Sequence, residues 1–370
     1  MRGLISAGGT GGGIFPALAV VQTLRRNDPE AQILWIGGEG GMEADIVPRY
    51  QIAYHSIPAA GLHGVGLGRM LPNGLSLARG FLRSLAVVRD FRPQVLLVTG
   101  GYVAVPAALA SWVNRVPILA FLPDLQPALA MRFTARLAQR VALSAAESRA
   151  WFARSTDTVV TGYPLRQELM AAEREEARRH FGIEGQGFVL LILGGSRGAR
   201  PINRGVEAAL ADLLEHLEVI HITGSSDWEQ VCQVAGNLPP DLRARHHAFP
   251  FLYEEMGLAL AAGDLAVSRA GASILGEYPH FLLPSILVPY PHAGRYQEEN
   301  ADYLVRRGGA IKLAERDLGA RLKTTILELE RDRDRLARMQ RALRAIRVED
   351  GSARLAQEFV RLAKDKGQKE

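Results

Sequence analysis

The 370-residue chain carries 44 Lys and Arg against 39 Asp and Glu, a formal net charge of +5, and 48% of its residues are hydrophobic. This length and composition predict a globular protein of two domains, and the mildly basic balance suits a phosphate-rich partner or an anionic membrane surface. Nucleic acid is not expected as a partner because no Lys/Arg block is interleaved with aromatic residues, and the single cysteine excludes an internal disulfide framework.

A glycine-rich loop lies near the N-terminus. Residues 4–7 are predicted to form a strand, residues 8–13 read Gly-Gly-Thr-Gly-Gly-Gly, and residues 14–20 begin a helix. Small residues ahead of a helix let a phosphate approach the backbone N–H groups, and the helix dipole favours its negative charge. The loop lacks the Lys-Ser/Thr ending of a P-loop and the spacing of a dinucleotide fingerprint. The pattern favours a phosphate contact or close backbone approach over an ordinary turn.

Strands predicted at residues 33–38, 95–99 and 116–121 alternate with helical segments, among them a short helix at 42–48. Such alternation is typical of a parallel sheet covered on both faces, which binds ligands beyond the carboxyl ends of its strands. The strand-end candidates, besides the glycine loop, are Gly100, Gly101, Tyr102 and Asp124.

Residues 69–89 are apolar and basic, with no acidic residue among them. A helix with one apolar and one basic side suits an anionic lipid surface, whereas an ordinary amphipathic helix packs on a sheet. We expect sheet packing for the later part and membrane contact for residues 69–79, where Pro72 and Gly74 are expected to break the helix. The expected membrane contacts are Arg69, Leu71, Leu75 and Arg79. No signal peptide and no run of 18 apolar residues is present, so we expect a cytoplasmic protein without a spanning helix.

The opening pattern recurs in the second half of the chain. After a candidate linker at residues 161–166 and a charged helix, a strand, the loop Gly-Gly-Ser-Arg-Gly-Ala and a helix follow between residues 188 and 201. Further strands are predicted at 219–223 and ending near 249–252. The recurrence implies a second, similar α/β domain.

Residues 268–301 form a candidate nucleotide-diphosphate cradle. They open with Ser-Arg-Ala-Gly-Ala-Ser, lead into a short helix containing Glu277, continue through the apolar run 284–289 and reach Gln297 at another helix start. A phosphate suits the helix start, and a carboxylate a turn further on can accept hydrogen bonds from ribose hydroxyls. The alternative interpretation is an ordinary strand–helix connection.

The C-terminal part is predicted to be helical and heavily charged over residues 317–346. Asp332 and Asp334 form an Asp-x-Asp there, which we interpret as a solvated helix face; no metal is expected. A last helix at 353–363 is expected to return to the first domain. The expected domains are residues 1–163 with 350–370, and residues 164–349.

Several segments occur in order along nearly the whole chain: the glycine loop with IFPALAV, then MEADIVP, GGYVAVPAALA, TGYPLR, GGSRGAR, VSRAGAS and QEENA. Together they resemble the MurG family of glycosyltransferases. The resemblance implies a GT-B fold, an α/β architecture of two Rossmann-like domains whose parallel sheets face across a cleft. It implies inverting transfer of N-acetylglucosamine (GlcNAc) from UDP-GlcNAc to the polyprenyl-linked acceptor lipid I, giving lipid II, by a peripheral protein on the cytoplasmic face of the membrane. No cofactor is implied.

The resemblance also assigns residues by position. Those implied for UDP-GlcNAc are Thr10, Gly11, Gly12, Asp124, Arg166, Ser196, Leu252, Ala272, Ser273, Glu277 and Gln297. Among them, Leu252 is assigned to the uracil, Ala272 and Ser273 to the diphosphate, Glu277 to the ribose and Gln297 to the GlcNAc hydroxyls. Those implied for the acceptor pyrophosphate are Gly9, Thr10, Gly11, Gly12, Gly101 and Tyr102.

The chain departs from the family pattern at two places. The family's glycine loop ends in a histidine where this chain has Gly13, and the family's His-Glu-Gln-Asn is replaced by residues 121–124, ending in Asp124. An inverting transfer needs a base near the acceptor hydroxyl or relies on positioning. We hypothesise that Asp124 is that base; His63 and His292 are weaker candidates, because a lone loop histidine is more often structural.

Three rival functions are considered. One is a related glycosyltransferase with another acceptor. Another is a UDP-GlcNAc epimerase of the same fold, which the basic apolar segment 69–89 disfavours. The third is a non-catalytic homologue that binds a nucleotide sugar, which Gly13 keeps open.

Overall fold

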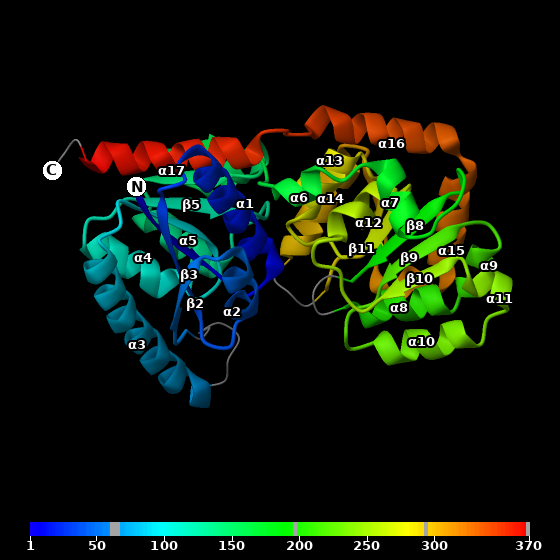
Figure 1. Ribbon diagram of the computed structural model, residues 1–370, viewed down its shortest axis with the longest axis horizontal. Coiled ribbons are helices and arrows are strands. Elements are labelled where there is room, and N and C mark those ends of the chain that lie inside the picture. Colours follow the sequence, from blue (N-terminus) through cyan, green and yellow to red (C-terminus); the bar gives the residue numbers. More distant parts are fainter. Residues whose placement is uncertain (60–66, 195–197, 292–294, 368–370) are drawn as a thin grey trace. The chain divides into compact units, whose positions relative to one another are not determined.

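The computed structural model describes residues 1–59, 67–194, 198–291 and 295–367. The chain divides into two compact units, Met1–Arg166 with Asp350–Glu370, and Gln167–Glu349. The division after Arg166 lies at the end of the segment, residues 161–166, that is interpreted as a linker. Each unit is a parallel sheet with helices on both faces (Figure 1), so the two α/β sheets predicted from the sequence are confirmed.

The first unit is built on a seven-stranded sheet of order β3-β2-β1-β4-β5-β6-β7, in which every neighbouring pair is parallel. Its strands are β1 (Arg2–Ala7), β2 (Gln32–Gly38), β3 (Ala53–Ile57), β4 (Val95–Gly100), β5 (Ile118–Leu122), β6 (Arg140–Leu143) and β7 (Thr158–Val160). Because β1, β4 and β5 are neighbours, the loops that follow them share the carboxyl edge of the sheet.

Helices cover both faces of this sheet (Figure 1). They are α1 (Gly11–Asn27), α2 (Glu43–Ile46), α3 (Leu67–Phe91), α4 (Ala104–Val113), α5 (Leu129–Leu137) and α17 (Gly351–Gly367), with short 3-10 turns at Val47–Tyr50 and Ala146–Trp151. The C-terminal helix α17 packs against α1, β4 and β5. On the other face, α3, α4 and α5 enclose a core of Val, Leu, Ile and Ala side chains.

The expectation of a broken helix near residue 72 is wrong. Helix α3 runs unbroken from Leu67 to Phe91 through Pro72 and Gly74. Pro72 lies in the second turn, where it removes one backbone hydrogen bond near the start of a 25-residue helix, and the later turns keep theirs.

The second unit has a six-stranded parallel sheet of order β10-β9-β8-β11-β12-β13. Its strands are β8 (Val189–Leu193), β9 (Glu218–Ile222), β10 (His246–Phe249), β11 (Leu265–Ser268), β12 (Ser285–Leu287) and β13 (Ala310–Lys312). Its helices are α6 (Gln167–Met170), α7 (Arg174–His180), α8 (Arg200–Glu207), α9 (Leu210–Leu214), α10 (Trp228–Gly236), α11 (Pro240–Arg243), α12 (Met256–Ala262), α13 (Ile274–Phe281), α14 (Tyr296–Arg306), α15 (Leu318–Arg331) and α16 (Arg333–Ile346), with a 3-10 turn at Glu315–Asp317.

The single helix expected over residues 317–346 is two helices. Asp332 ends α15 and begins α16, where its carboxylate accepts a hydrogen bond from the Arg335 N–H at 2.8 Å. A carboxylate at this position satisfies an otherwise unpaired amide of the new helix, which favours the break.

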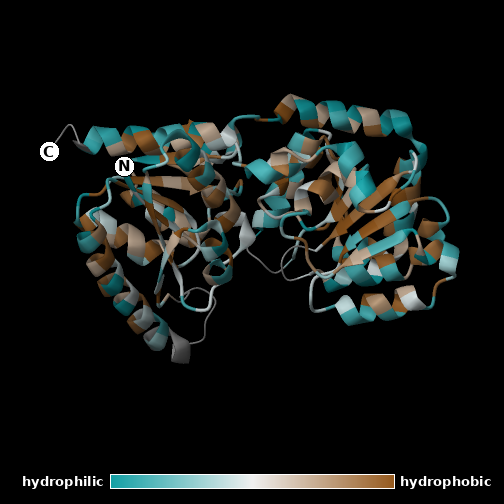
Figure 2. Cartoon of the chain, viewed as in Figure 1, coloured by the Kyte–Doolittle hydropathy of each residue, from teal (hydrophilic) through white to brown (hydrophobic). Residues whose placement is uncertain are grey.

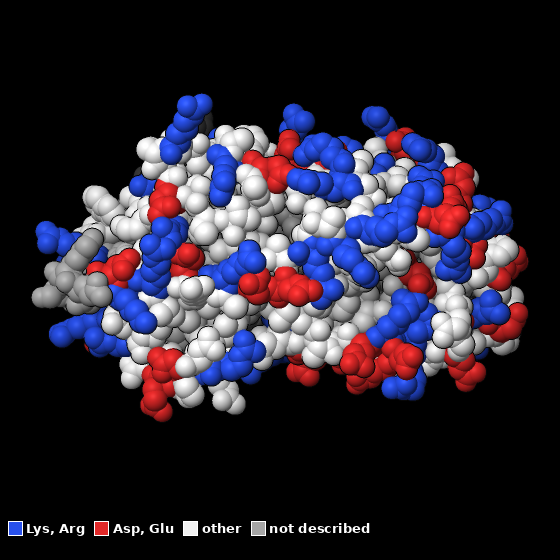
Figure 3. Space-filling view, turned by 90° about the horizontal axis from the view of Figure 1, so that it is seen from above, with Lys and Arg blue, Asp and Glu red and all other residues white. Residues whose placement is uncertain are grey.

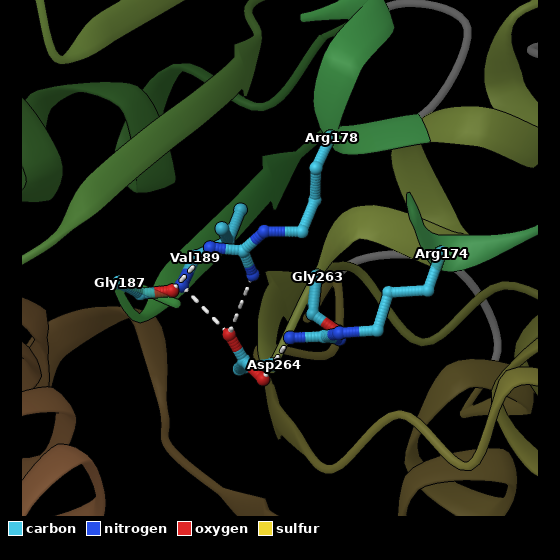
Figure 4. A network of polar contacts seen from close by, with 6 residues as sticks. All are labelled: Arg174, Arg178, Gly187, Val189, Gly263 and Asp264. Carbon is cyan, nitrogen blue, oxygen red and sulfur yellow. Dashed lines mark hydrogen bonds and ion pairs between the residues drawn. The ribbon is translucent and has the colours of Figure 1, made fainter. Parts of the chain in front are cut away.

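Each sheet has its own apolar interior, visible as brown strands in Figure 2. In the second unit the amino ends of β8 and β11 are joined by Asp264 (Figure 4). The Asp264 carboxylate accepts from the Val189 N–H at 2.9 Å and from Arg174 Nη2 at 2.6 Å. Arg178 is buried beside it and donates to the Gly187 carbonyl at 2.6 Å. This polar cluster lies at the edge opposite the strand ends where a ligand is expected, so we interpret it as a structural support.

Candidate active site

The glycine loop after β1 packs closely on the loop after β4. Gly9 and Gly101 both adopt the left-handed backbone region, with φ of 89° and 82°. A Cβ added at Gly101 would lie 2.5 Å from the Gly8 carbonyl oxygen, so only glycine allows the two loops this approach. The predicted close backbone approach is therefore present, and it brings Gly101 beside the loop that contains Thr10.

The loop ends in the first turn of α1. Thr10 is the N-cap residue, its carbonyl accepts from the Gly13 and Ile14 N–H groups, and its exposed side chain makes no capping hydrogen bond. The leading amides of a helix have no intrahelical partners. Gly11 and Gly12 thus present amides at the positive end of a 17-residue helix, which suits a phosphate.

Side chains from distant segments hold this turn in place. Thr99 Oγ1 donates to the Gly13 carbonyl at 2.6 Å, and the Tyr163 hydroxyl donates to the Gly12 carbonyl at 3.3 Å. These contacts fix the carbonyl side of the turn and leave its amide side for a ligand. A Cβ added at Gly13 would meet nothing closer than the Thr99 carbonyl at 3.4 Å, so the backbone accepts a side chain where the family has histidine.

The other first-unit candidates lie around the same edge. Tyr102 is exposed after β4, and Asp124 is partly buried after β5. Arg166, expected to contact the donor, is only 6% exposed. Its guanidinium lies 4.4 Å from the centre of the Phe15 ring and donates to the Tyr50 hydroxyl at 3.1 Å, so in this structure it packs beside α1.

In the second unit the small-residue turn lies between β11 and α13. Because β8 and β11 are neighbouring parallel strands, this turn and the glycine loop after β8 share one edge. Ser273 is the N-cap residue of α13 and makes no capping hydrogen bond, while Ala272 is buried. No atom lies within 4 Å of a Cβ built at Gly271, so the turn is open on that side.

Three side chains fix this turn. The Asn300 amide donates to the Ala270 carbonyl at 3.1 Å, and the buried Tyr278 hydroxyl donates to Ser268 Oγ at 2.6 Å. Arg269 forms an ion pair with Glu315 and donates to the Val288 carbonyl at 3.1 Å. Burial raises the pKa of Tyr278 well above its ordinary value, so its hydroxyl stays a donor at neutral pH. These hydrogen bonds and the ion pair therefore hold the turn in place.

The remaining donor candidates surround this edge. Glu277 is partly buried in α13, and Gln297 Oε1 accepts a hydrogen bond from the Tyr290 N–H at 2.9 Å. Leu252 follows β10 and is only 6% exposed, whereas the adjacent Tyr253 is exposed and packs on Phe251.

Some candidates lie outside the described residues, namely Ser196, His63 and His292. Arg69 and Leu71 lie in α3, but their side chains are outside the description. Within the described ranges, no group of three or more His, Cys, Asp and Glu side chains is arranged to hold a metal ion. In the same residues, no helix is long and apolar enough to cross a membrane.

Sequence reasoning assigned no role to Glu43, Arg269 or Tyr278, although each contacts one of the two turns. Glu43 is buried and accepts a hydrogen bond from the Gly9 N–H at 3.1 Å, so the Gly9 amide, expected at the acceptor pyrophosphate, already has a partner. The available signal was that Glu43 and Arg269 lie in segments shared with the family, MEADIVP and VSRAGAS.

The chain matches two family models, the glycosyltransferase family 28 N-terminal domain over residues 4–143 and the C-terminal domain over residues 189–355. It is 38% identical over 352 residues to the UDP-N-acetylglucosamine--N-acetylmuramyl-(pentapeptide) pyrophosphoryl-undecaprenol N-acetylglucosamine transferase of Desulforudis audaxviator, covering 94% of each chain.

Solved structures share the fold. MurG of Acinetobacter baumannii superposes with a TM-score of 0.74 at 24% identity, covering 97% of this chain and 99% of that one. UDP-GlcNAc 2-epimerase of Neisseria meningitidis, bound to UDP-GlcNAc, superposes with a TM-score of 0.68 at 14% identity, covering 99% and 100%. The fold alone thus does not separate transferase from epimerase, but the sequence match does. The chain belongs to the MurG family of N-acetylglucosamine transferases.

Proposed function

We propose that the protein transfers GlcNAc from UDP-GlcNAc to lipid I, undecaprenyl-pyrophosphoryl-MurNAc-pentapeptide, to form lipid II with inversion at the anomeric carbon. The observation that carries this proposal is that each sheet has, at its carboxyl edge, a turn of small residues that leads into a helix start, at Thr10–Gly12 and at Ala272–Ser273. Donor and acceptor each contain a diphosphate, and each helix start suits one. We assign the turn at Thr10, Gly11 and Gly12 to the acceptor pyrophosphate and the turn at Ala272 and Ser273 to UDP.

The transfer step needs a proton acceptor. The acceptor hydroxyl attacks the anomeric carbon, the bond from that carbon to the UDP oxygen breaks, and UDP leaves with the electron pair. We propose that the Asp124 carboxylate takes the hydroxyl proton, since Gly13 offers no side chain for this role. Asp124→Asn should lower kcat by about 100-fold, in line with the usual contribution of a general base. Unchanged kcat would remove Asp124 from this role.

We propose that the reaction needs no metal ion. The two helix starts supply partial positive charge to both diphosphates, and arginines such as Arg166 supply further charge. Transfer should therefore proceed at an unchanged rate in excess EDTA. Loss of transfer in EDTA that Mg²⁺ restores would contradict this proposal.

We propose that α3 lies on the anionic cytoplasmic face of the membrane. Leu75 and Leu82 are 54% and 63% exposed and lie two turns apart, with Arg79 exposed on the same side of the helix. Figure 3 shows basic and acidic side chains mixed on the face that it presents, so net charge alone does not mark a membrane-binding surface there. The apolar and basic α3 surface is the better candidate.

Vesicle binding tests this surface. The protein should sediment with phosphatidylcholine vesicles that contain phosphatidylglycerol and much less with phosphatidylcholine alone. Arg79→Glu should weaken binding by about tenfold or more, since each basic residue near such a surface contributes about 1 kcal/mol. The matched charge reversal Arg321→Glu, at an exposed position of α15, should leave binding unchanged. If the two charge reversals weakened vesicle binding equally, the assignment of the membrane-binding surface to α3 would be wrong.

The decisive experiment is transfer of labelled GlcNAc from UDP-GlcNAc to a short-chain lipid I analogue, with and without the analogue. Product that depends on the analogue is the expected result. UDP release without a new glycoside would indicate hydrolysis. Tight UDP-GlcNAc binding with neither transfer nor hydrolysis would favour another acceptor or a non-catalytic homologue. Production of UDP-N-acetylmannosamine would favour an epimerase.

A further inference from the structure

Glu43 is a buried carboxylate with an unusual set of partners. It begins the short helix α2, just after β2, and is 1% exposed. Its Oε1 accepts from the Gly38 N–H at 2.8 Å, and its Oε2 accepts from the Gly9 N–H at 3.1 Å. Within the described part of the chain, no Lys or Arg forms an ion pair with it. A buried carboxylate costs free energy unless hydrogen bonds satisfy it, so these two amides are its main stabilisation.

Glycines in the surrounding backbone leave room for the Glu43 side chain. A Cβ added at Gly8 would lie 2.2 Å from Glu43 Oε1, and one added at Gly41 would lie 2.5 Å from both of its oxygens. At Gly37 the added Cβ would lie 2.3 Å from the Tyr54 hydroxyl oxygen and 2.7 Å from Glu43 Cγ. Real Cβ atoms do not approach so closely, so each of these positions must lack a side chain for the carboxylate to reach its place.

The same carboxylate therefore joins the ends of two strands. Gly9 follows β1 and has the left-handed φ of 89° that turns the chain into Thr10, while Gly38 ends β2. A hydrogen bond to the Gly9 amide fixes the orientation of that peptide and hence the direction in which the next amides point. Thr99 and Tyr163 hold the far end of the turn by its carbonyls, and Glu43 holds its beginning by an amide.

We propose that Glu43 is the positioning residue for the pyrophosphate of the lipid acceptor. This inference rests on the proposed function in assigning that ligand to the glycine loop. By binding the Gly9 N–H, Glu43 withdraws this amide from the ligand and aims the amides of Gly11 and Gly12 at it. A displacement of about 1 Å in such a turn can cost about 100-fold in rate, because it misaligns the acceptor hydroxyl with the anomeric carbon.

The test is a set of substitutions at Glu43 with a matched control. Glu43→Gln keeps the size of the side chain but turns an N–H₂ group toward one of the two backbone N–H donors. It should lower kcat/KM for the lipid I analogue by about 10- to 100-fold. The KM for UDP-GlcNAc should stay within about twofold, because the proposed UDP turn belongs to the other unit. Asp45→Asn removes a charge from the exposed side of the same short helix and should leave both values unchanged.

A second measurement does not depend on transfer. Amide hydrogen exchange, followed by mass spectrometry on the full-length protein, should speed up in peptides covering residues 8–13 of Glu43→Gln, while peptides of residues 167–349 keep their wild-type rates. A purely structural role predicts instead that all of residues 1–166 exchange faster. Either that pattern or wild-type exchange at residues 8–13 would overturn the inference. If the wild type makes no lipid II but residues 8–13 respond as expected, the proposed function fails while the positioning of the loop stands.

Discussion

At the scale of single residues, Gly8 and Gly13 bracket one loop but face different surroundings. A Cβ at Gly8 would lie 2.2 Å from a Glu43 oxygen, whereas a Cβ at Gly13 would lie 3.4 Å from its nearest neighbour, the Thr99 carbonyl. The first position has no room for a side chain and the second does. The glycines of the loop are thus not equivalent, although the sequence presents them as one run.

This difference predicts the outcome of two alanine substitutions. Gly8→Ala should lower the free energy of unfolding by about 1–3 kcal/mol through overpacking and should weaken transfer to the lipid acceptor. Gly13→Ala, inside the first turn of α1, should change stability by no more than about 1 kcal/mol, with alanine favoured in a helix, and should leave transfer largely intact. Urea unfolding and steady-state kinetics measure both. Equal losses of stability and transfer activity in the two variants would show that neither position has room for a side chain.

Residue-scale contacts also show what a sequence reading misses. The two turns of small residues ahead of α1 and α13 were predictable, because small residues before a helix are a local signal. The role of Glu43 was not predictable from the sequence. Its partner is the backbone amide of Gly9, which is 34 positions away, and glycine has no side chain that would indicate the contact. Asn300 and Tyr278 are similar cases, since the first holds the Ala270 carbonyl and the second the Ser268 hydroxyl, each from a helix whose packing the sequence does not reveal.

At the scale of elements, the longer buried strands were predictable, whereas most of the short ones were not. Strands β1, β2, β4, β5, β8 and β9 lie close to their predicted positions, since each is a run of apolar residues. The prediction missed β7 and β13, which have three residues each, and β6 and β11, which have four. It also missed the edge strand β3, most of whose residues are not buried. The break at Asp332 was missed because the charged pattern continues on both sides of it.

Strands β9 and β10 and helix α8 are joined by a buried chain of neutral side chains. His221 Nε2 lies 3.1 Å from Asn203 Oδ1, and His221 Nδ1 lies 3.3 Å from His246 Nε2. With each ring neutral, His246 donates to His221 and His221 donates to Asn203. Burial, with a smaller contribution from repulsion by a neighbouring histidine, lowers the pKa of His221 to about 3 and that of His246 to about 4.

These pKa values predict a loss of stability in acid. The unfolded chain binds protons at these histidines below its ordinary pKa of about 6.5, while the native protein does not until about pH 4. The unfolded state therefore binds more protons as the pH falls from about 6.5 to 4, and stability decreases over this window. At pH 5 each histidine accounts for a loss of about 2 kcal/mol. Urea unfolding at pH 7.5 and 5 measures it. His246→Gln should reduce the pH dependence, whereas His216→Gln, at an exposed position, should not.

Helix α17 is the element that completes the first unit. The Phe359 ring is fully buried, and a Cβ at Gly3 of β1 would lie 2.9 Å from it. Ser352 Oγ also donates to the Leu165 carbonyl at 2.8 Å. Phe359→Ala should lower the free energy of unfolding by about 3–5 kcal/mol, the usual cost of removing a buried phenylalanine. Arg361→Ala, at an exposed position of the same helix, should change it by no more than about 0.5 kcal/mol. Urea unfolding compares them, and similar costs would mean that α17 is not part of the core.

At the scale of the whole molecule, the two units differ in how the chain builds them. The second unit is one continuous segment, Gln167–Glu349, whereas the first combines Met1–Arg166 with Asp350–Glu370. Each sheet has a separate core of buried apolar side chains. A continuous segment with its own core can fold alone. The first unit includes a helix from the far end of the chain, so it should lose stability when that helix is removed.

Two fragments put this difference to the test. The fragment of residues 167–349 should unfold in one cooperative transition by circular dichroism in urea. It carries the turn proposed for UDP, so UDP at 100 times its dissociation constant should raise the free energy of unfolding by about 2.7 kcal/mol. The fragment of residues 1–166 lacks α17, leaves the surface around Gly3 uncovered, and should fold stably only when a peptide of residues 350–370 is added. A cooperative transition of 167–349 that UDP does not move would separate the fold from the proposed donor site. Folding of 1–166 to the same stability with and without the peptide would show that the last helix is dispensable, and the first unit would then be complete at Arg166.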